Sequence, residues 1–211
     1  MTGETIAYRP GELDAGIVER AAGFIKSGGI IVYPTETLYG LGADAGNART
    51  LRRLSDLKGR EGAKPFLVIV DDFERLRPLV AEVSSQAQVL MNAFWPGPLT
   101  LVFKASPDVP SDLTAGTGTV GARVPSNDFC RALVRASGRP ITSTSANRAG
   151  APPLDSIEEI RNTLSEGIDL FIDAGVRLTG APSTVVDVSG PTPLLLREGA
   201  VRWEQIARTL R

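Results

Sequence analysis

Three cations, Lys58, Arg60 and Lys64, follow one another on a glycine-punctuated stretch of the chain. This stretch joins an expected helix at residues 47–57 to an apolar run at residues 66–70. Cations gathered between a helix and a strand can bind phosphate or carboxylate groups. Cations are also favoured at a helix C-terminus without any ligand, so a solvated basic turn is the alternative. The spacing indicates an anion site or such a turn, and it identifies no reaction.

A row of hydroxyl groups at residues 142–145 leads to Asn147. Alternate side chains of a strand face one way, so Ser143 and Ser145 are predicted to share a face. Such a row can hydrogen-bond a ribose, a phosphate or a polar amino acid. The alternative is a Ser/Thr turn that satisfies its own backbone.

A second polar group follows the apolar run at residues 30–33, where Pro34 stops the expected strand. The next residues are Thr35, Glu36 and Thr37. Open α/β sheets bind ligands at the ends of their strands, so these side chains are candidates for a ligand site.

Two arginines, Arg123 and Arg197, stand near the ends of expected strands. The planar guanidinium can hold a carboxylate through two parallel hydrogen bonds. A surface ion pair is the alternative for each of them. Together with the cations and hydroxyls above, they point to a small-molecule anion site.

The composition excludes several classes of protein. The 211-residue chain has no histidine and one cysteine, Cys130, so Ser-His and Cys-His nucleophilic pairs and histidine-based zinc sites are excluded. A net charge of −1 argues against a nucleic-acid binder that uses its whole surface. Without a signal-peptide core or an apolar stretch long enough to span a bilayer, the chain is expected to be soluble and cytoplasmic.

Apolar periodicity predicts alternating strands and helices. Strands are expected at residues 30–33, 66–70, 99–104, 119–124, 170–173, 183–188 and 194–197. Helices are expected at residues 13–26, 47–57, 85–94, 128–137, 156–164 and 203–210. The Pro- and Gly-rich segment 106–118 is expected to be an exposed loop. The alternation predicts an α/β fold with one mixed sheet, and residues 1–211 are expected to form a single domain.

Seven ordered motifs together resemble a known family. They are residues 33–37 (YPTET) with 39–42 (YGLG), 58–60 (KGR) with 64–65 (KP), 95–100 (WPGPLT), 121–125 (GARVP), 142–147 (TSTSAN), 182–187 (PSTVVD) and 196–199 (LREG). The chain is similar to the YrdC-like family of L-threonylcarbamoyladenylate synthases, in its short, single-domain form. The resemblance runs from about residue 17 to residue 197.

The resemblance implies a twisted mixed sheet with flanking helices around a deep, positively lined cavity. It implies a nucleotidyltransferase that forms threonylcarbamoyl-AMP and pyrophosphate from L-threonine, bicarbonate and ATP, for threonylcarbamoyladenosine modification of tRNA. Lys58 and Arg60 would be catalytic and hold the ATP phosphates. The other implied ATP ligands are Thr119, Ser145, Asn147 and Arg197, and the implied threonine ligands are Thr35, Arg123, Ser143 and Ser183.

The resemblance also implies Mg²⁺ carried on the ATP phosphates, with no metal ligand from the protein. The chain is expected to contact the tRNA threonylcarbamoyl-transfer machinery transiently and to bind RNA weakly. No contact with a membrane is expected. Two positions depart from the family pattern: Glu61 replaces a frequent proline, and residues 148–150 replace a frequent Ser-Gly. The alternative functions are a non-catalytic double-stranded RNA-binding module and a paralogue acting on another carbamoyl adenylate.

Overall fold

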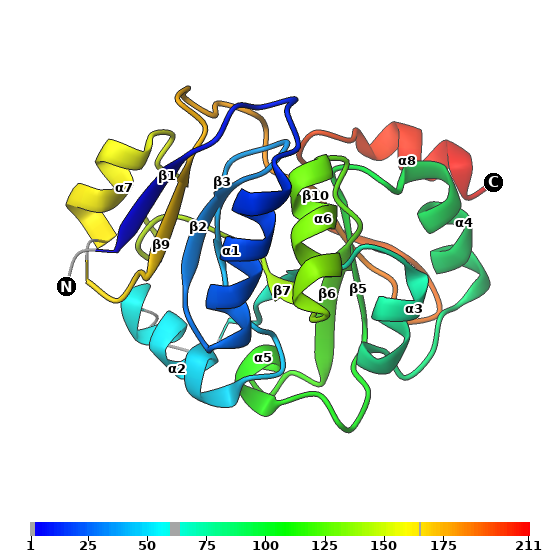
Figure 1. Cartoon of the computed structure of the whole chain (residues 1–211). Helices are drawn as coiled ribbons and strands as arrows, with labels where there is room; N and C mark the ends of the chain where they lie inside the picture. Colours follow the sequence, from blue (N-terminus) through cyan, green and yellow to red (C-terminus); the bar gives the residue numbers. More distant parts are fainter. Residues whose placement is uncertain (1–2, 60–63, 165) are drawn as a thin grey trace.

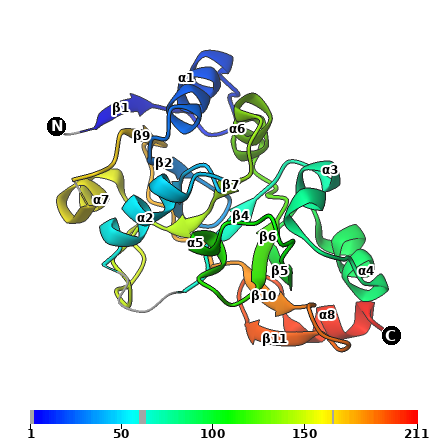
Figure 2. The same cartoon turned by 90° about the horizontal axis from the view of Figure 1, so that it is seen from below.

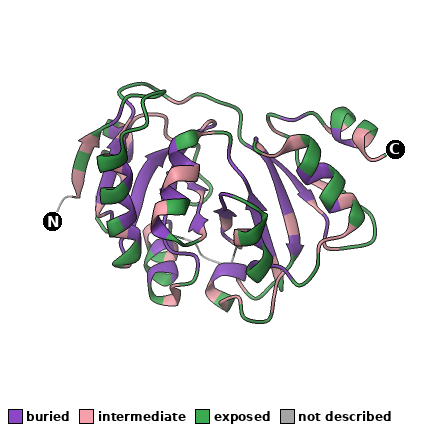
Figure 3. Cartoon of the chain, turned by 45° about the vertical axis from the view of Figure 1, so that its right-hand side comes forward, coloured by how far each residue is buried: buried purple, intermediate pink, exposed green. Residues whose placement is uncertain are grey.

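The computed structural model describes residues 3–59, 64–164 and 166–211. Its strands form two mixed sheets that lie side by side (Figures 1 and 2). Figure 3 shows that the strands are largely buried, whereas the helices expose their outer faces. The α/β class with flanking helices is therefore confirmed. The described helices include none that is long and apolar enough to cross a membrane.

The first sheet has five strands in the order β1-β9-β2-β3-β8. The β1/β9 and β9/β2 pairs are parallel, and the β2/β3 and β3/β8 pairs are antiparallel. The strand bounds are Glu4–Ala7 (β1), Leu170–Asp173 (β9), Ile31–Pro34 (β2), Tyr39–Gly42 (β3) and Thr144–Ser145 (β8). The central strand β2 is buried along its whole length, and it ends at Pro34, which has no N–H to extend the ladder.

The second sheet has six strands in the order β11-β10-β5-β6-β4-β7. Parallel pairing joins β10 to β5 and β4 to β6, and the other three pairs are antiparallel. The strand bounds are Leu194–Arg197 (β11), Thr184–Asp187 (β10), Leu99–Lys104 (β5), Thr119–Arg123 (β6), Leu67–Ile69 (β4) and Ile141–Thr142 (β7).

The expectation of one sheet is wrong, and the hydroxyl-rich segment shows why. Ile141 and Thr142 pair with β4 of the second sheet, whereas Thr144 and Ser145 pair with β3 of the first. The chain thus changes sheets at Ser143, within a segment whose sequence predicts one continuous strand. Each piece has only two residues, too few for side-chain periodicity to reveal the break.

Helices cover the sheets and carry side-chain caps at several N-termini. Asp14 accepts from two backbone N–H groups at the start of α1, and Asn47 accepts from Thr50 at the start of α2. α1 and α6 pack together over buried apolar residues of both sheets (Figure 1). The bounds are Ala15–Lys26 (α1), Ala48–Leu57 (α2), Phe73–Leu76 (α3), Arg77–Leu79 (the 3₁₀ helix η1), Ser85–Phe94 (α4), Ser111–Thr114 (α5), Asp128–Ser137 (α6), Ile157–Leu164 (α7) and Trp203–Thr209 (α8).

The expectation of an exposed loop at residues 106–118 is wrong in its middle. That segment contains the one-turn helix α5, and its Leu113 is fully buried. The backbone N–H of Phe66 donates to the carbonyl of Leu113 at 3.0 Å. A single apolar residue among turn-forming residues gives no periodic signal, so this burial depends on contacts distant in sequence.

Candidate active site

A cavity of about 460 Å³ lies between the two sheets. Both sheets contribute to its lining, through β3 and β8 of the first and through β4, β6 and β11 of the second. The charged side chains of its described lining are all cations: Lys58, Lys64, Arg123 and Arg197. Hydroxyl and amide groups supply most of the remaining polar surface. This combination suits a ligand with several anionic groups.

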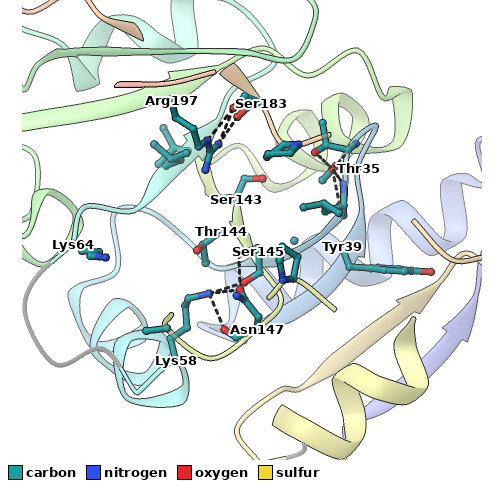
Figure 4. Close-up of a pocket in the computed structure, with 18 of the residues that line it drawn as sticks. Thr35, Tyr39, Lys58, Lys64, Ser143, Thr144, Ser145, Asn147, Ser183 and Arg197 are labelled. Carbon is teal, nitrogen blue, oxygen red and sulfur yellow. Dashed lines mark hydrogen bonds between the residues drawn. The ribbon is translucent and has the colours of Figure 1, made fainter. Parts of the chain in front are cut away.

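Lys58 stands at one end of the cavity, directly after α2 (Figure 4). Its side chain is buried, and Nζ donates to the carbonyl of Ser145 at 2.6 Å. Nζ also donates to the carbonyl of Asn147 at 2.9 Å and to its Oδ1 at 3.3 Å. An ammonium group has three N–H donors, so these three contacts match its capacity. Lys58 therefore ties the end of α2 to the turn that follows β8.

That turn is closed by its own polar groups as well. Ser145 Oγ donates to Asn147 Oδ1, and Asn147 Nδ2 donates to the carbonyl of Ala151. The N–H of Ala149 donates to the carbonyl of Lys58 at 2.8 Å. Ala149 and Gly150, at the position where the chain departs from the family pattern, both line the cavity. The departure thus lies in the wall of the site.

Arg123 is a buried cation in the cavity wall, with only 6% of its side chain exposed. Its Nη1 donates to Glu36 Oε1 at 2.6 Å. A guanidinium has five N–H donors, and this is the one side-chain hydrogen bond that the structure gives Arg123 within the described residues. Arg123 therefore combines burial with unused donors, which favours a planar anion such as a carboxylate.

Arg197 and Ser183 stand at the opposite end of the cavity from Lys58 (Figure 4). Arg197 donates to the carbonyl of Ser183 through Nε at 3.2 Å and Nη2 at 2.8 Å, and Nη2 also reaches its Oγ at 3.3 Å. Burial, and secondly the positive charge of Arg123, lower the pKa of the Arg197 guanidinium. An anion placed near both arginines would relieve this repulsion.

Thr35 and Ser143 complete the predicted amino-acid pocket. Thr35 Oγ1 donates to the carbonyl of Leu38 at 2.7 Å and accepts from the N–H groups of Thr37 and Leu38. The Thr35 hydroxyl is therefore satisfied within its own turn in this structure. Ser143 lies where the chain changes sheets, and Figure 4 shows it between the two ends of the cavity.

The structure brings most of the predicted site residues together in this one cavity. The predicted residues that line it are Thr35, Lys58, Arg123, Ser143, Ser145, Asn147, Ser183 and Arg197. Thr119 is not among the lining residues; its Oγ1 lies 3.0 Å from that of Thr117, in an exposed contact. Arg60 and Glu61 lie outside the described residues.

Lys64 and Thr144 also line the cavity, although the predicted site did not include them. Lys64 belongs to the cation group that the sequence singles out, so its spacing was a usable signal. Thr144 carries no such signal, because strand alternation places it on the face opposite Ser143 and Ser145. The break between β7 and β8 removes that alternation.

Cys130 lies behind the Thr35 turn and is fully buried in α6. Its thiol donates to the carbonyl of Pro34 at 3.4 Å. Burial raises the pKa of the Cys130 thiol, so it stays protonated near neutral pH. Cys130 is thus a buried structural thiol of α6.

The comparisons with known proteins identify the family. The Sua5/YciO/YrdC family model, described as "Telomere recombination", matches residues 23–199. The chain therefore belongs to the Sua5/YciO/YrdC family, and the predicted family resemblance is confirmed.

Several relatives carry the name threonylcarbamoyl-AMP synthase. The protein from Pyrococcus abyssi is 38% identical over 190 residues, which are 90% of this chain and 56% of that protein. The protein from Thiobacillus denitrificans is 39% identical over 166 residues, or 79% of this chain and 88% of that protein. The chain spans little more than half the length of the relatives from Pyrococcus abyssi and Bacillus subtilis, 56% and 55%.

Two solved structures show the same fold. Pyrococcus abyssi Sua5 complexed with L-threonine superposes with a TM-score of 0.90 at 35% identity, covering 99% of this chain and 61% of that one. Escherichia coli YciO superposes with a TM-score of 0.84 at 30% identity, covering 95% of this chain and 97% of that one.

Proposed function

We propose that the chain is a threonylcarbamoyl-AMP synthase, a nucleotidyltransferase that uses L-threonine, bicarbonate and ATP. The observation that carries the proposal is the gathering of three cations, the buried Arg123 and Lys58 and the partly buried Arg197, in one cavity. The two reacting partners, the carbamate of threonine and ATP, are both anions, which repel each other in the absence of fixed cations. The names of the relatives and the threonine complex of the Pyrococcus abyssi protein support the same proposal.

The reaction needs few chemical groups from the protein. The ammonium group of threonine combines with bicarbonate to give a carbamate, and water and one proton are released to solvent. A carbamate oxygen then bonds to the α-phosphorus of ATP. The bond from this phosphorus to the bridging oxygen breaks, and pyrophosphate leaves with the bonding electrons. The carbamate is already an anionic nucleophile, so the displacement needs no side-chain base. Positioning and charge neutralisation are the contributions left to the chain.

At the end of the cavity near Lys58, we assign the nucleotide to Lys58, Ser145 and Asn147. Arg60 is proposed to bind the ATP phosphates on the family resemblance alone. Lys58 neutralises phosphate charge, and its contacts keep Ser145 and Asn147 in place. Thr119 remains a proposed nucleotide ligand on the family resemblance alone.

At the opposite end, we assign the carboxylate of threonine to Arg123 and its side chain to Thr35, Ser143 and Ser183. Arg197 lies beside Arg123 and holds Ser183, so it connects the amino-acid pocket to the nucleotide. We propose that Arg197 neutralises negative charge at the point where the two substrates meet.

Mg²⁺ enters the proposal as part of the nucleotide substrate, carried on its phosphates. The described residues contain no group of three or more His, Cys, Asp or Glu that could hold a metal ion. The charged side chains of the described cavity lining are cations, which repel Mg²⁺. The residues thus do not fit a protein-bound metal, and we derive no step through one.

The proposal is tested by incubating the protein with ATP, Mg²⁺, L-threonine and labelled bicarbonate, with no RNA present. We expect labelled threonylcarbamoyl-AMP and an equal amount of pyrophosphate. Synthesis that requires added RNA would contradict a free-standing enzyme. Formation of another carbamoyl adenylate, with no threonylcarbamoyl-AMP, would identify a paralogue with a different substrate.

A further inference from the structure

Glu36 is a buried acid that the proposed mechanism leaves without a role. One of its oxygens, Oε1, accepts from Arg123 Nη1 at 2.6 Å, and 16% of its side chain is exposed. The other oxygen, Oε2, is buried and has no hydrogen-bond partner among the described residues. A buried carboxylate oxygen that accepts no hydrogen bond lowers the stability of the folded chain. Such a group beside a ligand site is therefore a candidate for a functional role.

Glu36 reaches the cavity through Arg123. Glu36 does not belong to the cavity lining. Its partner Arg123 does, and so do Thr35 and Thr37, which flank Glu36 in the sequence. The carboxylate therefore holds the guanidinium from behind, which leaves its other N–H donors for the cavity. This arrangement fits a residue that places Arg123 and does not touch the substrate.

Several hydrogen bonds close the turn that contains Glu36. Thr35 Oγ1 closes the turn by accepting from Thr37 and Leu38 at 3.1 Å each, and the Thr35 and Thr37 hydroxyls lie 2.9 Å apart. The carbonyl of Pro34 accepts from the Cys130 thiol, which fixes the turn to α6. Glu36 thus occupies a fixed point from which it can define the position of Arg123.

We propose that Glu36 is a positioning residue that sets where the Arg123 guanidinium stands, and so governs recognition of the amino-acid carboxylate. This inference rests on the proposed function. Two parallel hydrogen bonds to a carboxylate tolerate little displacement, and a misplacement near 1 Å costs up to about 100-fold in rate. The length of the Glu36 side chain should therefore affect threonine binding more than its charge does.

Two conservative variants separate reach from charge. Glu36→Gln keeps the length and an acceptor oxygen but removes the charge. Glu36→Asp keeps the charge but shortens the side chain by one methylene, or about 1.5 Å. Adenylate formation is first measured with the wild type, then KM for threonine and for ATP is measured with both variants. Melting temperatures are recorded for each protein.

We expect Glu36→Asp to raise the KM for threonine about tenfold and the KM for ATP less than about twofold. Glu36→Gln should shift the threonine KM less than about threefold, because the acceptor stays in place. In an Arg123→Ala background, Glu36→Asp should add nothing further. If Glu36→Asp does not fold, Glu36→Ala takes its place as the shortened variant.

The outcomes that would overturn this role are distinct from failure of the proposed function. A wild type that makes no threonylcarbamoyl-AMP contradicts the proposed function itself. With an active wild type, three results overturn the positioning role of Glu36. They are an unchanged threonine KM in the shortened variant, an equal rise in Glu36→Gln, and an equal rise in the KM for ATP.

Discussion

The two ends of the cavity use their cations in opposite ways. At one end, the Lys58 ammonium has three N–H donors and contacts three oxygens of the 145–147 turn. At the other end, Arg123 directs one hydrogen bond to Glu36. Burial, together with the positive charge of Arg123, lowers the pKa of the Arg197 guanidinium. Figure 4 shows Lys58 and Arg197 on opposite sides of the cavity.

The difference separates two roles that a buried cation can have. A cation whose donors are matched by oxygens of the chain itself organises the chain around it, and its removal disturbs local structure. A cation with unused donors beside a like charge has most to gain from an anionic ligand, and its removal chiefly weakens binding. We therefore expect stability and affinity to respond differently at the two ends.

The largest expected effect is at Lys58. Lys58→Ala removes three contacts of a buried ammonium and a charge for the ATP phosphates, so kcat/KM for ATP should fall about 10²–10³-fold. The free energy of unfolding should fall by about 2–4 kcal/mol, which lowers the melting temperature by roughly 5–10 °C. Steady-state kinetics and calorimetry measure the two losses.

Lys26→Ala is the matched control, because Lys26 is an exposed lysine in the last turn of α1. It should change neither quantity by more than about 0.5 kcal/mol. Full thermal stability in Lys58→Ala would show that the Lys58 contacts do not hold the 145–147 turn.

At the other end, Arg123→Ala should lower kcat/KM for threonine about 100-fold, because a charge-assisted bidentate contact is lost. Serine and valine carry the same carboxylate, so their rates should fall by a similar factor. Competition of the three amino acids in the ATP-dependent assay measures the factor. A variant that discriminates only against threonine would place Arg123 near the substrate side chain instead.

Substrate choice in the wild type tests the hydroxyl groups of the arginine end. Serine lacks one methyl group, which costs about 1–1.5 kcal/mol, so it should react roughly tenfold less efficiently than threonine. Valine leaves the partners of the threonine hydroxyl unpaired and should react most slowly. The values of kcat/KM for the three substrates check this order. A faster reaction with valine than with serine would mean that the pocket selects shape without using Thr35, Ser143 and Ser183.

The smallest expected effect comes from packing behind Ser183. A Cβ at Gly199 would lie 2.1 Å from the carbonyl oxygen of Pro182 and 2.8 Å from the carbonyl carbon of Ser183. Gly199→Ala should therefore displace Ser183, cost about 1–3 kcal/mol in stability and raise the threonine KM a few-fold. Gly190→Ala is the control, because a Cβ there has nothing within 4 Å. Equal melting temperatures and KM values in the two variants would contradict this effect.

Much of the fold could be predicted from the sequence, because the elements with a strong local pattern form where that pattern lies. Five elements, α4, α6, β5, β9 and β11, have the predicted bounds. The division into two sheets and the helix α5 could not be predicted. They depend on pairing between distant segments and on one buried leucine, which leave no periodic trace.

The candidate site divides in the same way. Residue types and spacing indicated cations and hydroxyls, and the family motifs predicted which of them would gather. The contact between Glu36 and Arg123 joins residues 87 positions apart, and no local pattern could indicate it. The hydrogen bonds from Lys58 to the 145–147 turn likewise join segments distant in sequence, so no local pattern predicts them. Spacing predicted an anion site there and did not predict that Lys58 would contact backbone oxygens.

The central claim is that the two ends of the cavity bind different substrates. Isothermal titration calorimetry of the wild type, Lys58→Ala and Arg123→Ala with Mg-ATP and with L-threonine tests it directly. The account predicts a crossed pattern: Lys58→Ala weakens ATP at least about tenfold and threonine little, and Arg123→Ala does the reverse. Equal loss of both ligands in both variants would contradict two separate subsites and leave one undivided anion site.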